Sequence, residues 1–349
     1  MNKPLIEACV DSYQSCVNAW KGGADRLELC AHLAIGGCTP SPFVFRQVME
    51  DCDHIKANIL IRPRFGDFLY TEKEMELMCD EIRMFRLLGA NGVVIGALTP
   101  DGDLDMEKMK RMMDCAGGMD VTLHRAFDMT RDPMETLEKA IELGCKTILT
   151  SGQQSDVVAG KDLLKDVYAA AAGRIDIMAG CGVKKWNIQE VHDHTGIVVF
   201  HTTGRKGALD SGMKYRKSTV AMGLPTLSEY EIWETDEQEF RECAQIVHSF
   251  GKYDPRRAEG KGRFFWKWTC LFPCIKPKDR RELYDVYRKS NESGGRKVQP
   301  PVRKSRREEK RRNPLQTGTG RKDGKRRCDR CHQMDLCQQP FKRPGQLRF

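Results

Sequence analysis

The strongest constraint in this sequence is a joint that recurs between its predicted helices and strands. A helical segment ends at glycine, and an apolar, mostly β-branched run begins within a few residues. The joint stands at Gly23 before residues 26–30, at Gly89 before 93–97 and at Gly144 before 147–150. Glycine readily takes the left-handed conformation that ends a helix. Each joint therefore predicts a chain that leaves a helix and re-enters a sheet.

Hydrophobic periodicity extends this pattern to eight strand–helix units. Strands are predicted at residues 6–12, 26–30, 56–63, 93–97, 121–128, 147–152, 175–179 and 197–202, and helices at 13–21, 42–50, 72–88, 105–116, 133–143, 159–172, 187–194 and 227–250. Apolar strands that alternate with helices predict a parallel sheet. Eight such units in about 250 residues match a (β/α)8 TIM-type barrel of the α/β class. A doubly wound sheet is the alternative, but no Gly-x-Gly-x-x-Gly motif follows the first strand.

Charge divides the chain into an acidic domain, residues 1–250, and a basic tail, residues 251–349. The tail carries 30 Lys and Arg against 11 Asp and Glu, a net charge of +19, which leaves −10 for the domain. Charge runs with few apolar residues predict disorder. The run Arg303–Arg312 can attract nucleic acid or serve in nuclear import, and a solvated tail without a partner is the alternative. Cys328, Cys331 and Cys337 resemble only half of a zinc site.

The sequence also bears on location. No apolar run is long enough to span a bilayer, and the N-terminus lacks the apolar region of a signal peptide. We therefore expect a cytoplasmic protein without a transmembrane segment. Its 15 cysteines are then expected to be mostly reduced thiols.

Polar side chains follow the predicted strands at their carboxyl ends, where barrels carry their sites. Alternation along residues 121–128 would put His124 and Asp128 on one face, and Arg62 and Arg64 would share a face in the same way. Glu28 ends another strand. We expect these groups to meet at one barrel mouth, although a structural ion-pair network is the alternative.

Two functions of different class fit this mouth. Arginines attract carboxylate or phosphate, so one hypothesis is a metal-independent enzyme that acts on a small anionic metabolite. Its hypothetical catalytic groups are His124, Asp128 and Glu28. Residues expected to bind the substrate come from several strand ends, and glycines after a late strand often hold a phosphate; the set is Arg62, Arg64, Ser151, Gly180, Gly182 and His201.

The other hypothesis rests on Cys9 and Cys30, which lie on consecutive strands, each two residues after a glutamate. Neighbouring strands are about 4.8 Å apart, so the two thiols can meet. Two thiolates suit a soft ion such as Cu(I), whereas Zn(II) prefers four ligands. Two buried free thiols are the alternative.

Residues 4–250 resemble the copper homeostasis protein CutC family. The matching stretches are EACVDS at 7–12, GGADRLELC at 22–30, GGCTPS at 36–41, IRPRFGDFLY at 61–70, HRAFDM at 124–129, LTSG at 149–152, IMAGCGV at 177–183 and SGMKYR at 211–216. The resemblance implies a TIM-type barrel, a homo-oligomer, a cytoplasmic and sometimes nuclear location, and copper handling. It also implies that Cys9 and Cys30 are the Cu(I) ligands. Phe65 stands where the family pattern has glycine, and its ring is expected to narrow the mouth.

Overall fold

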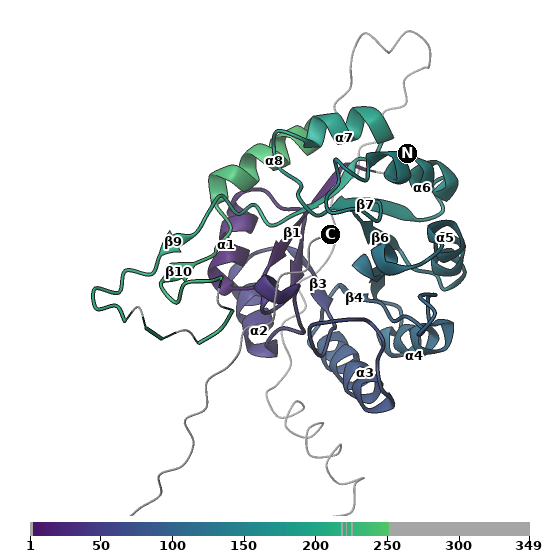
Figure 1. Ribbon diagram of the computed structural model, residues 1–349, viewed down its shortest axis with the longest axis horizontal. Coiled ribbons are helices and arrows are strands. Elements are labelled where there is room, and N and C mark those ends of the chain that lie inside the picture. The colour runs from purple at the N-terminus through teal and green to yellow at the C-terminus, as the bar shows by residue number, and fades with distance from the viewer. Residues whose placement is uncertain (1–2, 218, 221, 225, 251–349) are drawn as a thin grey trace, which may run out of the picture. The chain divides into compact units, whose positions relative to one another are not determined.

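The protein was analysed as a computed structural model, which describes residues 3–217, 219–220, 222–224 and 226–250. Its centre is a closed barrel of eight parallel strands, β1 to β8, in chain order (Figure 1). This confirms the predicted TIM-type barrel and excludes the doubly wound sheet. The predictions for the tail, including the basic run and the half zinc site, lie outside the described residues.

The elements alternate as the joints predict. The strands are β1 Leu5–Val10, β2 Arg26–Leu29, β3 Lys56–Leu60, β4 Gly92–Ile95, β5 Asp120–Leu123, β6 Thr147–Thr150, β7 Asp176–Gly180 and β8 Val199–Thr202. The helices are α1 Tyr13–Lys21, α2 Pro42–Asp51, α3 Glu72–Leu87, α4 Met106–Ala116, α5 Pro133–Glu142, α6 Lys161–Ala171, α7 Ile188–Thr195 and α8 Glu237–Ser249. Two short segments, η1 Leu33–Ile35 and η2 Arg125–Met129, are 3-10 helices.

Local chemistry accounts for most of these boundaries. The predicted joint glycines Gly23, Gly89 and Gly144 all have positive φ, at 92°, 89° and 81°. Helix starts are capped by side chains, most completely at α3. There the Thr71 hydroxyl accepts from the backbone N–H of Glu74, and the Glu74 carboxylate accepts from that of Thr71.

The two faces of the barrel strands serve different purposes. In β1, Ile6, Ala8 and Val10 belong to the main apolar core, which the helices complete. The intervening residues Glu7 and Cys9 face the barrel interior, because successive side chains of a strand alternate. That interior is polar near its centre and opens at the carboxyl ends of the strands.

Two strands end three or more residues before their predicted limits. β5 stops at Leu123, and the expected continuation to Asp128 is the 3-10 helix η2. β3 stops at Leu60, three residues before Pro63, which cannot donate to a strand ladder. Alternation no longer applies beyond these points. The expected faces shared by His124 with Asp128 and by Arg62 with Arg64 are therefore not formed.

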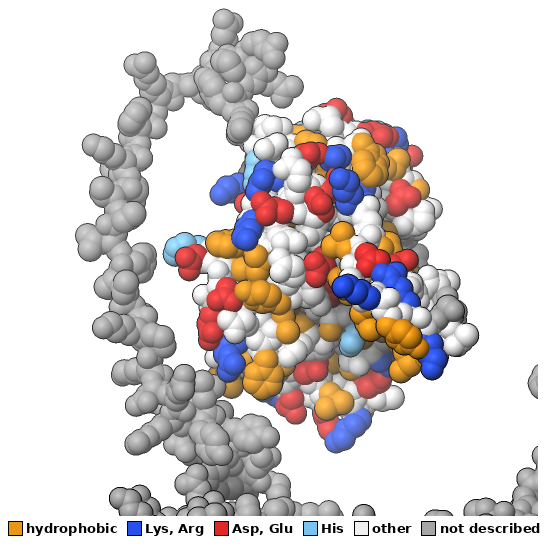
Figure 2. All heavy atoms as spheres, turned by 90° about the vertical axis from the view of Figure 1, so that its left-hand side faces the viewer, with side chains coloured by type: hydrophobic (Ala, Val, Ile, Leu, Met, Phe, Trp, Pro, Cys, Tyr) orange, Lys and Arg blue, Asp and Glu red, His pale blue; other side chains and the backbone are white. Residues whose placement is uncertain are grey.

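The segment between β8 and α8 also differs from its prediction. Instead of a helix from residue 227, it forms an antiparallel pair of short strands, β9 Leu209–Asp210 and β10 Glu231–Ile232. α8 begins only after Asp236, whose side chain caps it. Figure 1 shows this segment extending from the side of the barrel, and Figure 2 shows that face, where hydrophobic and charged side chains are mixed.

No described helix is both long enough and apolar enough to cross a bilayer.

Candidate functional site

A cavity of about 610 Å³ opens at the carboxyl ends of the strands. Several predicted site residues line it, namely Cys9, Glu28, Arg62, His124, Gly182 and His201. The other predicted residues, Cys30, Arg64, Asp128, Ser151 and Gly180, are not among its lining residues in the described part of the chain. The closed barrel therefore brings six of the predicted site residues to one cavity, and the other five lie outside its lining.

A buried ionic cluster forms the floor below this cavity. The register of the barrel sets Glu7 opposite Arg26 on β2 and opposite His201 on β8. The Glu7 carboxylate pairs with the Arg26 guanidinium and accepts a hydrogen bond of 2.8 Å from His201 Nδ1. Burial alone would raise the pKa of Glu7, but Arg26 and His201 outweigh it and hold the pKa at about 2.

Three ligand-type side chains meet directly above this cluster. The ligand atoms of Cys9, Glu28 and His201 all lie within 4.8 Å of one another, and all three residues are buried. The Cys9 thiol donates to Glu28 Oε1 at 3.7 Å. Burial raises the pKa of Glu28 to about 7. Burial also opposes protonation of His201, but the neighbouring Glu28 and Cys9 raise its pKa well above 6.5.

Cys30 lies beside this group but not on the cavity surface. It is 2% exposed and shares a small apolar cluster with Cys9, Leu60 and Val94. Its thiol donates to the Val10 carbonyl at 3.4 Å. The neighbouring Cys30 thiol, together with burial, raises the pKa of Cys9 well above 9. The two thiols are thus neighbours, and both are protonated at neutral pH in this arrangement.

Arg62 reaches the cavity from the loop after β3. Its Nη1 donates to the carbonyls of Gly36 and Gly37 at 3.0 and 3.1 Å, and its Nη2 donates to the Gly66 carbonyl at 2.6 Å. The guanidinium also lies over the Phe68 ring, 5.0 Å from its centroid. These contacts fix the cation in one place.

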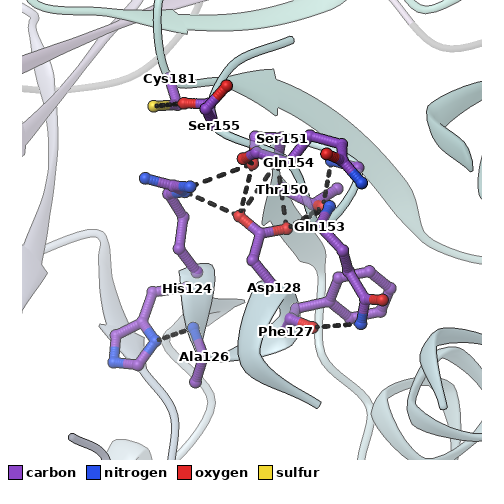
Figure 3. Close-up of polar contacts among 12 residues, drawn as sticks. His124, Ala126, Phe127, Asp128, Thr150, Ser151, Gln153, Gln154, Ser155 and Cys181 are labelled. Carbon is purple, nitrogen blue, oxygen red and sulfur yellow. Dashed lines mark hydrogen bonds and ion pairs between the residues drawn. The ribbon is translucent and has the colours of Figure 1, made fainter. Parts of the chain in front are cut away.

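His124 reaches the cavity from the end of β5. The backbone N–H of Ala126 donates to His124 Nδ1 at 3.1 Å, as Figure 3 shows. Burial and the nearby Arg62 lower the pKa of His124 to about 3, so its ring is neutral. Gly96 leaves room for the ring, because a Cβ at that position would lie 2.6 Å from His124 Cε1.

Asp128 is held in a separate network, away from the cavity. It accepts hydrogen bonds from Thr150 Oγ1 at 2.5 Å, from the backbone N–H groups of Ser151 and Gln153, and from Arg125 at 2.7 Å (Figure 3). The Ser151 hydroxyl lies within hydrogen-bond distance of both the Asp128 carboxylate and the Gln154 carbonyl. These contacts tie η2 to the loop after β6.

Arg64 and Phe65 also lie off the cavity. Arg64 pairs with Glu74 at 2.6 Å and with Asp67 at 3.0 Å, so it ties its loop to the start of α3. The Phe65 side chain is 65% exposed and is not a lining residue. The expectation that its ring narrows the mouth is therefore wrong.

The sequence and structure comparisons agree with one another. Residues 4–206 match the CutC family. The chain belongs to the CutC family. It is 47% identical over 240 residues to family protein CutC of Parabacteroides distasonis, covering 68% of this chain and 98% of that protein. It is 46% identical over 244 residues to the human copper homeostasis protein cutC homolog, covering 70% and 89%.

A solved CutC structure, from Streptococcus agalactiae, has the same fold. It superimposes with a TM-score of 0.55 at 29% identity, covering 57% of this chain and 98% of that one. The match to the CutC family ends at residue 206.

The rim of this CutC-family cavity carries cations that sequence reasoning missed. Lys184 comes from the segment after β7, and Arg205 and Lys206 come from the segment after β8. Lys184 Nζ donates to the Arg205 carbonyl at 2.5 Å, and Arg205 pairs with Asp11 at 2.5 Å. Their only signal in the sequence is their position a few residues beyond a strand end.

The two predicted glycines after β7 have different surroundings. Gly182 lines the cavity with a φ of 69°. Gly180 instead lies against the Leu149 side chain, where an added Cβ would clash. Packing alone accounts for glycine at position 180.

Proposed function

We propose that the protein takes part in copper homeostasis and binds Cu(I) through Cys9 and Cys30, with His201 as a neighbouring donor once its ring has lost a proton. The observation that carries the proposal is the position of the Cys9 thiol. Cys9 shares a buried cluster with Cys30, and its thiol lies within 4.8 Å of the ligand atoms of His201 and Glu28. Relatives named copper homeostasis proteins support the same role.

The donor types fit a soft ion. Cu(I) prefers thiolate and imidazole ligands, whereas a carboxylate oxygen is a hard ligand and a poor one for this ion. We therefore assign Glu28 a different part. It accepts the Cys9 S–H hydrogen bond, so it is placed to receive the proton that Cys9 loses when the metal binds.

Anaerobic titration with Cu(I) against a chromophoric competing chelator tests this proposal. Cys9→Ser and Cys30→Ser should each weaken binding, and the double variant should lose the tight site. Cys145→Ser is the matched control. Cys145 is as buried as Cys9, but it lies before β6 and outside the cluster that contains Cys9 and Cys30. A double variant that keeps full Cu(I) stoichiometry would refute the proposal.

A second candidate function is an enzyme that acts on a small anionic metabolite, a carboxylate or a phosphate. The observation in its favour is the charge of the cavity lining, which contains Arg62, Arg125, Lys184, Arg205 and Lys206. Glu28 is the single acidic residue among the described lining residues. Such a lining repels a free cation and attracts an anion. A volume of about 610 Å³ also suits a small molecule.

A thermal-shift panel of small phosphates and carboxylates tests the second candidate. Binding should raise the melting temperature of the protein, and Arg62→Met should remove that rise for at least one anion. The control is Arg174→Met, because Arg174 pairs with Glu138 and is not among the residues that line the cavity. Equal shifts in the Arg62 variant and the intact protein would count against this candidate.

Oligomer formation is a further part of the proposal. Large apolar side chains are exposed between β8 and α8, among them Tyr215 at 75% and Met222 at 81%. Light scattering of the intact chain would show a single protomer mass if the proposed homo-oligomer does not form. The cytoplasmic or nuclear location and a contact of the tail with nucleic acid stay predictions.

A further inference from the structure

Two donors at the barrel mouth have no hydrogen-bond partner within the described protein. They are Arg62 Nε and His124 Nε2, and their residues are 7% and 4% exposed. A buried polar group without a partner costs free energy, and native proteins rarely keep one without a reason. Neither the copper site nor the packing of the barrel uses these two atoms.

The surrounding backbone fixes which nitrogen of His124 carries the hydrogen. Ala126 N–H donates to Nδ1, so Nδ1 must be the acceptor, and the hydrogen of the neutral ring lies on Nε2. The other tautomer would set two N–H groups against each other. His124, which lines the cavity, therefore carries an uncharged N–H donor without an acceptor among the described residues, and Gly96 provides the space for its ring.

Backbone carbonyls also fix the orientation of the Arg62 side chain. Three backbone carbonyls accept hydrogen bonds from its terminal nitrogens, whereas Nε has no acceptor among the described residues. Phe68 links the two groups, because its ring lies 5.0 Å from the Arg62 guanidinium and 4.7 Å from the His124 ring. The Phe68 ring thus packs against both the Arg62 guanidinium and the His124 ring, and all three residues line the cavity.

The opposite wall of the cavity has different chemistry. It is formed by the segments after β7 and β8, which contribute Gly182, Lys184, Thr203 and Lys206. In (β/α)8 barrels these two segments are a frequent phosphate-binding position. Two lysines there supply the charge for such a group.

We propose that the cavity binds a small phosphorylated carbonyl compound, with its phosphate at the β7 and β8 segments and its carbonyl oxygen at His124 Nε2–H and Arg62 Nε–H. The inference rests on the second proposed function and names its substrate class. Two N–H donors that both reach one carbonyl oxygen would stabilise negative charge on that oxygen. His124 thus acts as a hydrogen-bond donor and not as a base.

Four probes separate the two ends of this ligand. Dihydroxyacetone phosphate carries both groups, glycerol phosphate lacks the carbonyl, dihydroxyacetone lacks the phosphate, and inorganic phosphate is the minimal anion. We expect the intact protein to bind dihydroxyacetone phosphate more tightly than glycerol phosphate in calorimetric titrations. His124→Asn should weaken the first about tenfold, the value of one good hydrogen bond, and leave the second unchanged.

The choice of variants keeps the test interpretable. Asparagine retains an acceptor for the Ala126 N–H but removes the donor from the position of Nε2. His194→Asn is the control, since exposed His194 pairs with Asp162 on the outer face. Lys184→Met with Lys206→Met should weaken both phosphates equally. Long-range ¹H–¹⁵N spectra of the intact protein should show His124 as the neutral Nε2–H tautomer, a readout that does not depend on any ligand.

The outcomes distinguish this inference from the second proposed function, on which it rests. An Nδ1–H or charged His124, or a His124→Asn variant that binds both phosphates as the intact protein does, overturns the inference alone. Binding of carboxylates but of no phosphate also overturns it and leaves the second function standing. Failure of every anion to bind overturns both.

Discussion

Replacing Glu7 by glutamine is expected to lower the free energy of unfolding by about 3 kcal/mol at pH 7. The Glu7 side chain is fully buried between Arg26 and His201, and its pKa falls from 4.5 to about 2 in the fold. Each tenfold change in proton affinity corresponds to about 1.4 kcal/mol, which gives the value above. This value already includes the loss of the Arg26 partner charge, because Arg26 is one of the groups that lower the pKa.

The pH dependence of this loss identifies its cause. A carboxylate with a lowered pKa stabilises the fold above its unfolded pKa of 4.5, and the contribution disappears as the pH falls towards about 2. The difference between the intact protein and Glu7→Gln should therefore be largest at pH 7 and should shrink as the pH falls to 3.

Urea unfolding at several pH values measures this difference. Glu190→Gln is the control, because exposed Glu190 pairs with Lys161 on the surface and should change stability little at any pH. A Glu7→Gln loss that is the same at pH 7 and pH 3, or that is absent at pH 7, would refute the electrostatic reasoning. It would point instead to packing, or to a Glu7 that is protonated in the fold.

Three further changes test the supports of the site. Asp128→Ala should lower the free energy of unfolding by about 2–4 kcal/mol, because several donors of β6 and the loop after it lose their acceptor. An unchanged urea unfolding curve would contradict this structural role. Gly180→Ala should cost about 1–3 kcal/mol by overpacking against Leu149, and a variant as stable as the intact protein would show that the barrel yields there. Thr71→Ala should lower stability by about 1 kcal/mol through loss of the α3 capping box, measured by the same unfolding curves, which would not shift if the cap were unimportant.

The barrel itself could be predicted from local signals. Glycine joints, capping residues and apolar runs each depend on a few neighbouring residues, so they are readable in the chain. Parallel closure then brings all carboxyl strand ends to one mouth. This is why Cys9, Glu28, Arg62 and His124, spread over five strands with His201, meet around one cavity.

The remaining details depend on what happens after each strand ends. Strand alternation predicted that Arg64 would accompany Arg62, but the chain leaves the ladder at Leu60, and Arg64 turns to Glu74. Asp128 was expected at the mouth for the same reason, and η2 carries it to the loop after β6 instead. The pairing of Glu7 with His201 depends on the register across the closing strands, which no single segment specifies.

The cavity draws its walls from two sources that tolerate change differently. Glu28 and His124 stand on or directly after barrel strands, where a shift of backbone would disturb the whole ring. Lys206 and Trp233 belong to the long segment between β8 and α8, outside the eight barrel strands. Selection or design can therefore change the segment between β8 and α8 so that the cavity binds a ligand with a different charged group. The side chains at the strand ends would stay the same.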